Sequence, residues 1–179
     1  MPETIWTTMS SPVGELLLTG DGRSLDGLYM CDAGPTSMPS NGRRRNSSPA
    51  LPARRSDDAF PDARTQLAEY FDGTRTTFEL ALSPEGTPFQ LRVWQALRQI
   101  PYAATASYGK VAAAIGQPSA SRAVGLANNR NPIAIIIPCH RVIGADGRLV
   151  GYGGGLDRKR YLLDLEASSL ARRAAGHSL

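Results

Sequence analysis

The chain of 179 residues contains only two cysteines and two histidines. Cys31 and Cys139 are too few for a disulfide scaffold or a four-ligand zinc site. Apolar runs are short, the longest lying near residues 133–137, whereas a membrane span needs ~20 apolar residues. The first residues have neither a basic start nor a long apolar stretch, so we expect no membrane span and no secretory signal. Proton transfer by imidazole at neutral pH falls to His140 or His177.

The net charge of +4 conceals opposite charges in the two halves of the chain. Residues 1–87 hold eight arginines, no lysine and twelve acidic residues, which gives −4. Residues 88–179 hold twelve basic and four acidic residues, which gives +8. A basic half favours a polyanion such as nucleic acid as its partner. An uneven but merely solvated surface is the alternative.

The first half has the pattern of a small sheet. Short β-prone runs at residues 5–8, 15–19 and 25–30, separated by turn residues, predict an antiparallel meander. Residues 32–60 are rich in Pro, Ser, Gly and Arg and predict a long surface loop. The arginines of that loop either contact DNA phosphates or belong to a solvated insertion.

A helix and a last strand complete the predicted N-terminal domain. Residues 62–71 have helical spacing, with Gly73 as a stop, and residues 76–82 alternate as a strand does. The sequence SPEG at 83–86 is a linker, and the sign of the charge changes just after it. We therefore expect one domain over residues 1–86.

The second half is predicted to be mainly helical. Capping patterns indicate helices over 88–100, 108–115 and 120–128, begun by Thr87, Ser107 and Ser119. The last two helices, joined by a short link after Gly116, match helix-turn-helix spacing. A final helix over 157–166 ends this domain, 87–166, and a flexible tail is expected over 167–179.

The helix predicted over 120–128 has unusually small side chains. It carries Ala123, Gly125 and Ala127 and a single charge, Arg122. Small residues allow either close packing in the core or entry of the helix into a narrow DNA minor groove.

The segment NPIAIIIPCHRV, residues 131–142, is the strongest candidate for chemistry. Cys139 follows a proline, and His140 could take its proton directly or through one water. A carboxylate would then hold the imidazole in one tautomer. Spacing does not distinguish Glu166 from Asp164 for this role. A small buried cysteine with no chemistry is the alternative.

The segment GYGGG, residues 151–155, is either a flexible hairpin tip or a backbone that approaches a ligand closely. The segment does not match the dinucleotide-binding fingerprint G-x-G-x-x-G, because Leu156 occupies the position of its last glycine. Tyr152 could line a pocket or pack in the core.

Five segments together resemble the O6-alkylguanine-DNA alkyltransferase family, in order and in spacing. They are FQLRVWQAL at 89–97, IPYAATASYGKVAAAIG at 100–116, SRAVGLANNRNP at 121–132, PCHRV at 138–142 and GYGGGLDRKRYLLDLE at 151–166. The resemblance covers residues 87–166 strongly and the N-terminal part weakly.

The resemblance implies an α+β protein: an N-terminal RNase-H-like antiparallel sheet with a helix, and a C-terminal helical domain of winged helix-turn-helix type. It makes Cys139 the nucleophile that accepts the alkyl group. His140 would activate Cys139 through a bound water, Glu166 would orient His140, and Asn131 would be the hinge that positions the active-site turn.

The resemblance also implies residues that contact DNA or the substrate base. They are Tyr108, Arg122, Ala123, Ala127, Arg141, Gly151, Tyr152, Gly153 and Gly154. Arg122 would enter the duplex in place of the extruded nucleotide. Tyr108 would act at the target nucleotide, and the glycine segment would close the guanine pocket.

The implied activity is irreversible transfer of an alkyl group from O6 of guanine, or O4 of thymine, in double-stranded DNA to Cys139. Each molecule would react once, without a cofactor. No metal is expected, because the N-terminal part holds Cys31 and no histidine. The resemblance implies a cytoplasmic protein that is monomeric in solution, and it leaves cooperative assembly on DNA open. A sensor of alkyl lesions without transfer and a thiol hydrolase are the alternatives.

Overall fold

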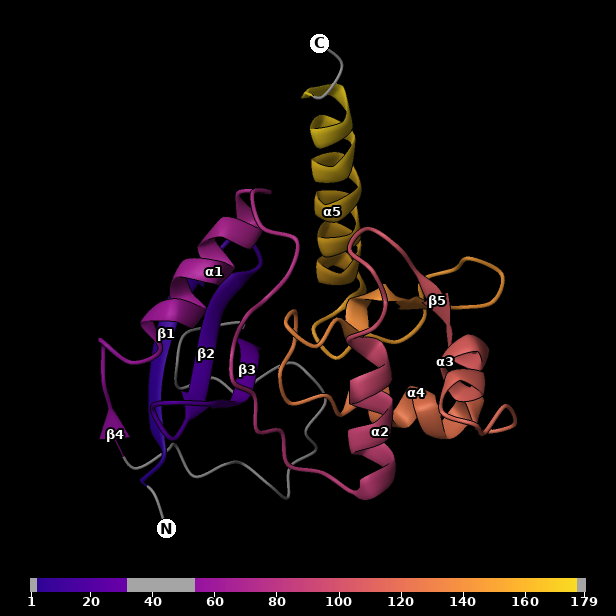
Figure 1. The fold of residues 1–179 in the computed structure, drawn as a ribbon, viewed down its shortest axis with the longest axis horizontal. Helices are drawn as coiled ribbons and strands as arrows, with labels where there is room; N and C mark the ends of the chain where they lie inside the picture. The colour runs from indigo at the N-terminus through magenta and orange to yellow at the C-terminus, as the bar shows by residue number, and fades with distance from the viewer. Residues whose placement is uncertain (1–2, 32–53, 177–179) are drawn as a thin grey trace.

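The computed structural model describes residues 3–31 and 54–176, and Figure 1 shows their arrangement. The N-terminal elements are β1 (Ile5–Ser11), β2 (Gly14–Gly20), β3 (Leu25–Cys31), β4 (Arg54–Arg55) and α1 (Pro61–Phe71). The C-terminal elements are α2 (Pro88–Leu97), β5 (Ala106–Ser107), α3 (Tyr108–Ala114), α4 (Ser121–Asn129), the 3-10 helix η1 (Cys139–Arg141), β6 (Val142–Ile143) and α5 (Leu156–Gly176). The sheet with α1 forms one side of the molecule and α2–α4 the other (Figure 1).

The N-terminal sheet has the strand order β3-β2-β1-β4. The first three strands pair antiparallel, which confirms the predicted meander. β4 adds a short parallel strand beside β1, within the stretch 32–60 that the sequence predicts as a loop. Residues 32–53 of that loop lie outside the described residues.

The strand predicted over residues 76–82 is wrong. The segment is irregular, with a bend at Thr77, and forms only an isolated bridge, between Leu25 and Leu82. Three residues before this bridge, the Gln66 side chain of α1 accepts from the Glu79 amide (2.8 Å) and donates to the Glu79 carbonyl (3.1 Å). A side chain thus satisfies backbone groups that a neighbouring strand would otherwise pair.

Two of the three predicted helix caps are confirmed. Thr87 and Gln90 form the reciprocal capping box of α2, and Ser107 accepts from the Lys110 amide at the start of α3. Each cap satisfies amides that have no partner within the helix. β5, immediately before α3, pairs with β6 and joins the helix-turn-helix to the segment after Cys139.

The cap predicted at Ser119 is wrong. α4 begins at Ser121 after Ala120, which makes no side-chain capping bond. The Ala120 amide donates to the Gln117 carbonyl at 2.9 Å, so residues 117–120 form a turn before the helix starts.

The predicted flexible tail is wrong over residues 167–176, which continue α5. Ser169 is buried, and Arg173 donates to the Gly73 carbonyl at 3.1 Å, so the extension packs against the end of α1. Residues 177–179 lie outside the described residues. Neither α5 nor any other helix in the described ranges is long and apolar enough to cross a membrane.

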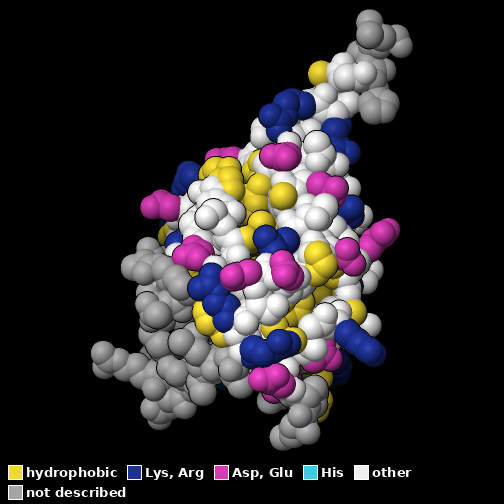
Figure 2. All heavy atoms as spheres, turned by 90° about the vertical axis from the view of Figure 1, so that its left-hand side faces the viewer, with side chains coloured by type: hydrophobic (Ala, Val, Ile, Leu, Met, Phe, Trp, Pro, Cys, Tyr) yellow, Lys and Arg dark blue, Asp and Glu magenta, His cyan; other side chains and the backbone are white. Residues whose placement is uncertain are grey.

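The two halves share one apolar core. The Leu28 amide of β3 donates to the Pro132 carbonyl (2.8 Å), and the Ala134 amide donates to the Leu28 carbonyl (3.2 Å). The chain leading to Cys139 is therefore fixed against the N-terminal sheet. Figure 2 shows the face on the side of the sheet and α1, where basic and acidic side chains are interspersed.

Candidate active site

Cys139 begins η1 directly after Pro138 and is 5% exposed. Burial raises the pKa of its thiol, because the thiolate is poorly solvated there. A hydrogen bond with Asn131, the charge of Lys159 and a hydrogen bond with Tyr152 act in the opposite direction. Cys139 is thus a neutral thiol whose neighbours favour the thiolate once its proton leaves.

Asn131 holds the turn that carries this cysteine. Its amide nitrogen donates to the Ile137 carbonyl (2.8 Å), and its amide oxygen accepts from the Ile133 amide (3.0 Å). Inside the turn Ile135 has φ +71°, a conformation that a β-branched residue rarely adopts. The buried Asn131 side chain therefore clamps a strained loop beside the thiol.

The imidazole of His140 is fully buried and its Nε2 lies 2.6 Å from Glu166 Oε1. Burial lowers the pKa of His140 below 6.5, and the Glu166 carboxylate offsets only part of that effect. A carboxylate accepts hydrogen bonds, so Nε2 carries the proton and Nδ1 the lone pair. Nδ1 is buried and has no hydrogen-bond partner within the described ranges. His140 is therefore arranged as a base, and the exposed Asp164 is not its partner.

Glu166 is buried among several hydrogen-bond donors. Its carboxylate accepts from Tyr70 Oη (2.8 Å), the Ala103 amide (3.1 Å), and Arg141 Nε and Nη2 (both 3.0 Å). Burial alone would raise the pKa of Glu166, but hydrogen bonds and electrostatic interactions with His140 and Arg141 bring it down to about 2. The carboxylate is ionised at neutral pH.

Arg141 departs from the sequence prediction. A contact with DNA or substrate is expected from the resemblance, but the guanidinium turns inward and is 7% exposed. It binds Glu166 and donates to the Ile100 carbonyl at 2.8 Å. The buried carboxylate needs this counter-charge, so Arg141 supports the His140–Glu166 pair from inside.

Sequence reasoning missed Lys159, which is fully buried on α5. Its ammonium donates to the carbonyls of Val142 (2.6 Å) and Val150 (3.1 Å). Burial lowers the pKa of Lys159 to about 8, while the charge of Cys139 acts the other way. The signal was present: Lys159 lies seven residues before Glu166, which places both on one face of a helix.

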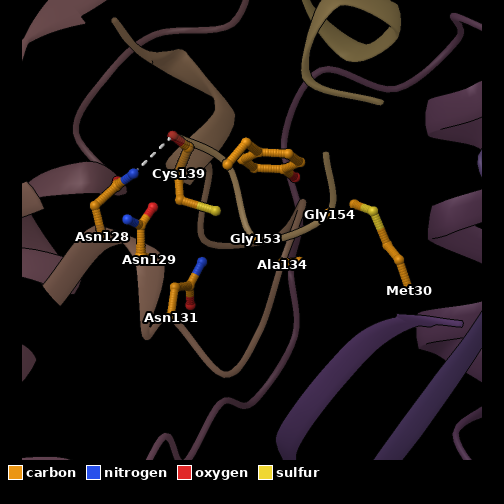
Figure 3. A pocket seen from close by; sticks show the side chains of 9 residues that line it. Met30, Asn128, Asn129, Asn131, Ala134, Cys139, Gly153 and Gly154 are labelled. Atoms are coloured by element: carbon orange, nitrogen blue, oxygen red, sulfur yellow. Dashed lines mark hydrogen bonds between the residues drawn. The ribbon is translucent and has the colours of Figure 1, made fainter. Parts of the chain in front are cut away.

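The glycine segment closes a pocket over Cys139 (Figure 3). Met30, Asn128, Asn131, Ala134, Cys139, Tyr152, Gly153 and Gly154 are among its lining residues. A Cβ at Gly154 would lie 3.0 Å from both Met30 Sδ and the Tyr152 ring, so only glycine fits there without a shift. The backbone of this segment therefore lies close to Met30 and Tyr152. Because Met30 belongs to β3, the N-terminal sheet also contributes to the pocket.

Tyr152 lies beside the thiol within this segment. Its hydroxyl is buried, and burial raises the pKa of Tyr152 well above 10. The Cys139 sulfur, when ionised, raises that pKa further. Gly151, with φ +50°, turns the chain just before it. Tyr152 therefore lines the pocket as a neutral phenol.

Two of the three α4 residues that were predicted to contact DNA lie on its exposed face. Arg122 and Ala123 are exposed, whereas Ala127 is buried and its carbonyl accepts from Trp94 Nε1 at 2.8 Å. Ala127 lies one turn after Val124 on the core face, so its predicted DNA contact is wrong. Leu126, 61% exposed, lies on the outer face instead.

Tyr108 lies between α4 and the residue that precedes the glycine segment. As the first residue of α3 it donates through Oη to the Val150 carbonyl at 2.8 Å. Its ring passes Gly125 of α4, where a Cβ would come within 3.7 Å of it. Burial raises the pKa of Tyr108 and the charge of Cys139 adds to that effect, so the phenol is neutral near the sulfur.

Comparisons with known proteins agree with this architecture. The model of the 6-O-methylguanine DNA methyltransferase DNA-binding domain matches residues 88–168, and that of the ribonuclease-like domain of 6-O-methylguanine DNA methyltransferase matches residues 4–84. The methylated-DNA–protein-cysteine methyltransferase of Mycobacterium leprae is 51% identical over 164 residues, which cover 89% of this chain and 90% of that protein. The protein of the same name from Methanosarcina acetivorans is 47% identical over 91% of this chain and 98% of its own.

The solved structures point the same way. Mycobacterium tuberculosis O6-methylguanine methyltransferase superposes with a TM-score of 0.80 at 48% identity, over 93% of this chain and 94% of its own. M. tuberculosis OGT in complex with DNA also superposes with a TM-score of 0.80 at 48% identity, over 92% of this chain and 94% of its own. These matches confirm the resemblance and the α+β fold. The chain belongs to the 6-O-methylguanine DNA methyltransferase family.

Proposed function

We propose that this protein repairs double-stranded DNA by moving an alkyl group directly from O6 of guanine, or O4 of thymine, to Cys139. The observation that carries the proposal is a buried thiol beside a neutral imidazole, whose other nitrogen is bound to an ionised carboxylate. Relatives at about 50% identity are named methylated-DNA–protein-cysteine methyltransferases, which supports the reaction type.

The transfer step follows from these groups. His140 Nδ1 accepts the proton of Cys139 through one water, and Glu166 stabilises the imidazolium that forms. The sulfur attacks the alkyl carbon, and the bond from that carbon to O6 breaks with its electron pair going to the oxygen. The guanine recovers a proton from the imidazolium through the water. The thioether has no good leaving group, so each molecule reacts once and needs no cofactor.

The damaged atom lies inside the base stack, so the nucleotide must leave the duplex before transfer. In our proposal α4 enters the minor groove, where the small Ala123 permits close approach and Arg122 fills the vacated space. Tyr108, Gly151, Tyr152, Gly153 and Gly154 form the walls that receive the base. Arg141 acts inside the protein through Glu166 and not on the DNA.

Residues 1–86 form a supporting domain, and residues 87–166 form the domain that binds DNA and reacts. The partner is duplex DNA containing O6-alkylguanine. The protein is a monomer in solution, and cooperative assembly on DNA stays open. A reactive thiol requires a reducing compartment, which favours the cytoplasm.

The stoichiometry of the reaction tests this function. With an excess of duplex that contains one O6-methylguanine, we expect methyl transfer to stop at one group per protein molecule. Repeated release of product from the same protein, or turnover of an ester or amide, would instead indicate a thiol hydrolase. Tight lesion binding with no loss of methyl from the DNA would indicate a sensor.

Replacing Arg122 with alanine should separate DNA entry from chemistry. We expect Arg122→Ala to slow transfer from duplex DNA about tenfold or more, because unstacking a base costs a few kcal/mol. Reaction with the free base O6-benzylguanine should be unchanged, since no duplex is opened. Arg130→Ala, which removes the same charge from the exposed end of α4, is the matched control. Equal slowing by both variants, or slowing with the free base, would contradict the role given to Arg122.

A further inference from the structure

The His140–Glu166 pair is contacted by a side chain from the other half of the protein. Tyr70, in the last turn of α1, is fully buried, and its Oη donates to Glu166 Oε1 at 2.8 Å. The other hydrogen-bond donors to this carboxylate come from residues 103–141. Tyr70 is thus the contact through which the N-terminal half reaches the proposed base.

Three neighbouring aromatic rings hold the Tyr70 hydroxyl in place. The Tyr70 ring lies edge-on to Phe71 (5.4 Å between centroids) and Tyr102 (6.2 Å), and beside Phe78 (5.5 Å). A ring packed on three sides has little rotational freedom, so its hydroxyl occupies one place. Burial and the charge of Glu166 raise the pKa of Tyr70 well above 10, so the hydroxyl remains a donor.

The two carboxylate oxygens of Glu166 are used differently. Oε2 accepts from Arg141 Nε and from the Ala103 amide. Oε1 accepts from Arg141 Nη2, from Tyr70 and from His140. The oxygen that orients the imidazole is therefore the same one that Tyr70 holds. A hydrogen-bond donor at this place restricts rotation of the carboxylate. It also competes with His140 for the negative charge of the Glu166 oxygen.

We propose that Tyr70 is a positioning residue for alkyl transfer: its hydroxyl fixes the Glu166 oxygen that orients His140 toward Cys139, an inference that rests on the proposed function. The N-terminal half then contributes to the reaction directly and not only to stability. The chemistry of the step is unchanged, because Tyr70 acts through Glu166 and touches neither the sulfur nor the base.

Removing only the hydroxyl gives two expected effects with defined signs. In Tyr70→Phe the carboxylate is freer to rotate, so we expect the maximal transfer rate to fall about tenfold. Glu166 Oε1 also loses a competing donor and attracts the imidazolium more strongly, which raises the pKa of His140. The neutral base is present above that pKa, so the acid limb of the transfer profile should move to higher pH.

The experiment uses the full chain and the free base O6-benzylguanine, so that DNA binding does not enter. Transfer rates from pH 5 to 8 are compared for the wild-type protein, Tyr70→Phe and the control Tyr161→Phe, whose ring is on α5 and 39% exposed. NMR titration of His140 is recorded for the same proteins. The chain has only two histidines, and a His177→Gln background identifies the signals.

We expect a slower reaction and a higher titration midpoint of His140 in Tyr70→Phe alone. An unchanged rate, profile and midpoint together with a lower melting temperature would reduce Tyr70 to a packing residue and overturn the inference. If the wild-type protein also transfers no methyl group from an O6-methylguanine duplex, the proposed function fails, while the His140 midpoint still decides whether Tyr70 controls the imidazole. If Tyr70→Phe does not fold, 3-fluorotyrosine at position 70, a stronger donor, should move the midpoint to lower pH, and no movement would overturn the inference.

Discussion

A Cys139→Ala protein is expected to accept no alkyl group and still to bind DNA. Alanine removes the sulfur and leaves the turn intact, because Asn131 holds that turn through the Ile133 and Ile137 backbone and not only through the thiol. The expected effect is complete loss of transfer, measured with a labelled methyl group in the duplex. Retained binding would be measured by electrophoretic mobility shift of the same duplex.

The second cysteine provides the matched control. Cys31 lies at the end of β3 and packs with Leu17 and Tyr29. We expect Cys31→Ala to keep one transferred group per molecule, even if its melting temperature falls. Loss of folding in Cys139→Ala would favour the interpretation of Cys139 as a buried apolar residue. Residual transfer in that variant would show that another group accepts the alkyl.

Replacing Glu166 with glutamine should have the next largest effect. The neutral glutamine amide cannot balance the positive charge of Arg141. Its NH₂ group would also face the N–H groups of Arg141, which are donors and cannot accept a hydrogen bond. Removing one partner of a buried ion pair destabilises proteins by about 3–5 kcal/mol. His140 also loses the carboxylate that stabilises its charged form, so transfer should slow about 100-fold.

The pH dependence of stability tests the electrostatic part of this expectation. The pKa of Glu166 is about 2 in the folded protein against an ordinary value of 4.5. Because the folded value is the lower one, the stabilisation is complete above pH 4.5 and is lost as the pH falls toward 2. Urea unfolding of the wild-type protein and Glu166→Gln should therefore differ most at neutral pH and converge in acid. A constant difference across this range would contradict an ionised Glu166.

Local signals predicted two of the three capped helix starts. The Thr87–Gln90 capping box is confirmed because capping depends on residues three apart in the sequence. Cys139 and His140 are adjacent in the sequence, so their proximity needed no tertiary information. Glu166 could be separated from Asp164 only in the folded protein, where one faces His140 and the other faces solvent.

The predictions that failed depend on tertiary contacts. The Gln66 side chain takes the place of a strand partner for residue 79. The end of α5 lacks an apolar stripe, and it is held by packing around the buried Ser169. Arg141 turns inward because a buried carboxylate is there to receive it. Tyr70 is 96 positions from Glu166 along the chain, and no local pattern connects the two.

The intact mass of the protein after reaction with an O6-methylguanine duplex shows whether the protein itself accepts the alkyl group. We expect every molecule to gain the mass of one methyl group, and peptide mapping to place that group on Cys139. Tight binding of the duplex with no change in mass, or a methyl group on any other residue, would contradict the account.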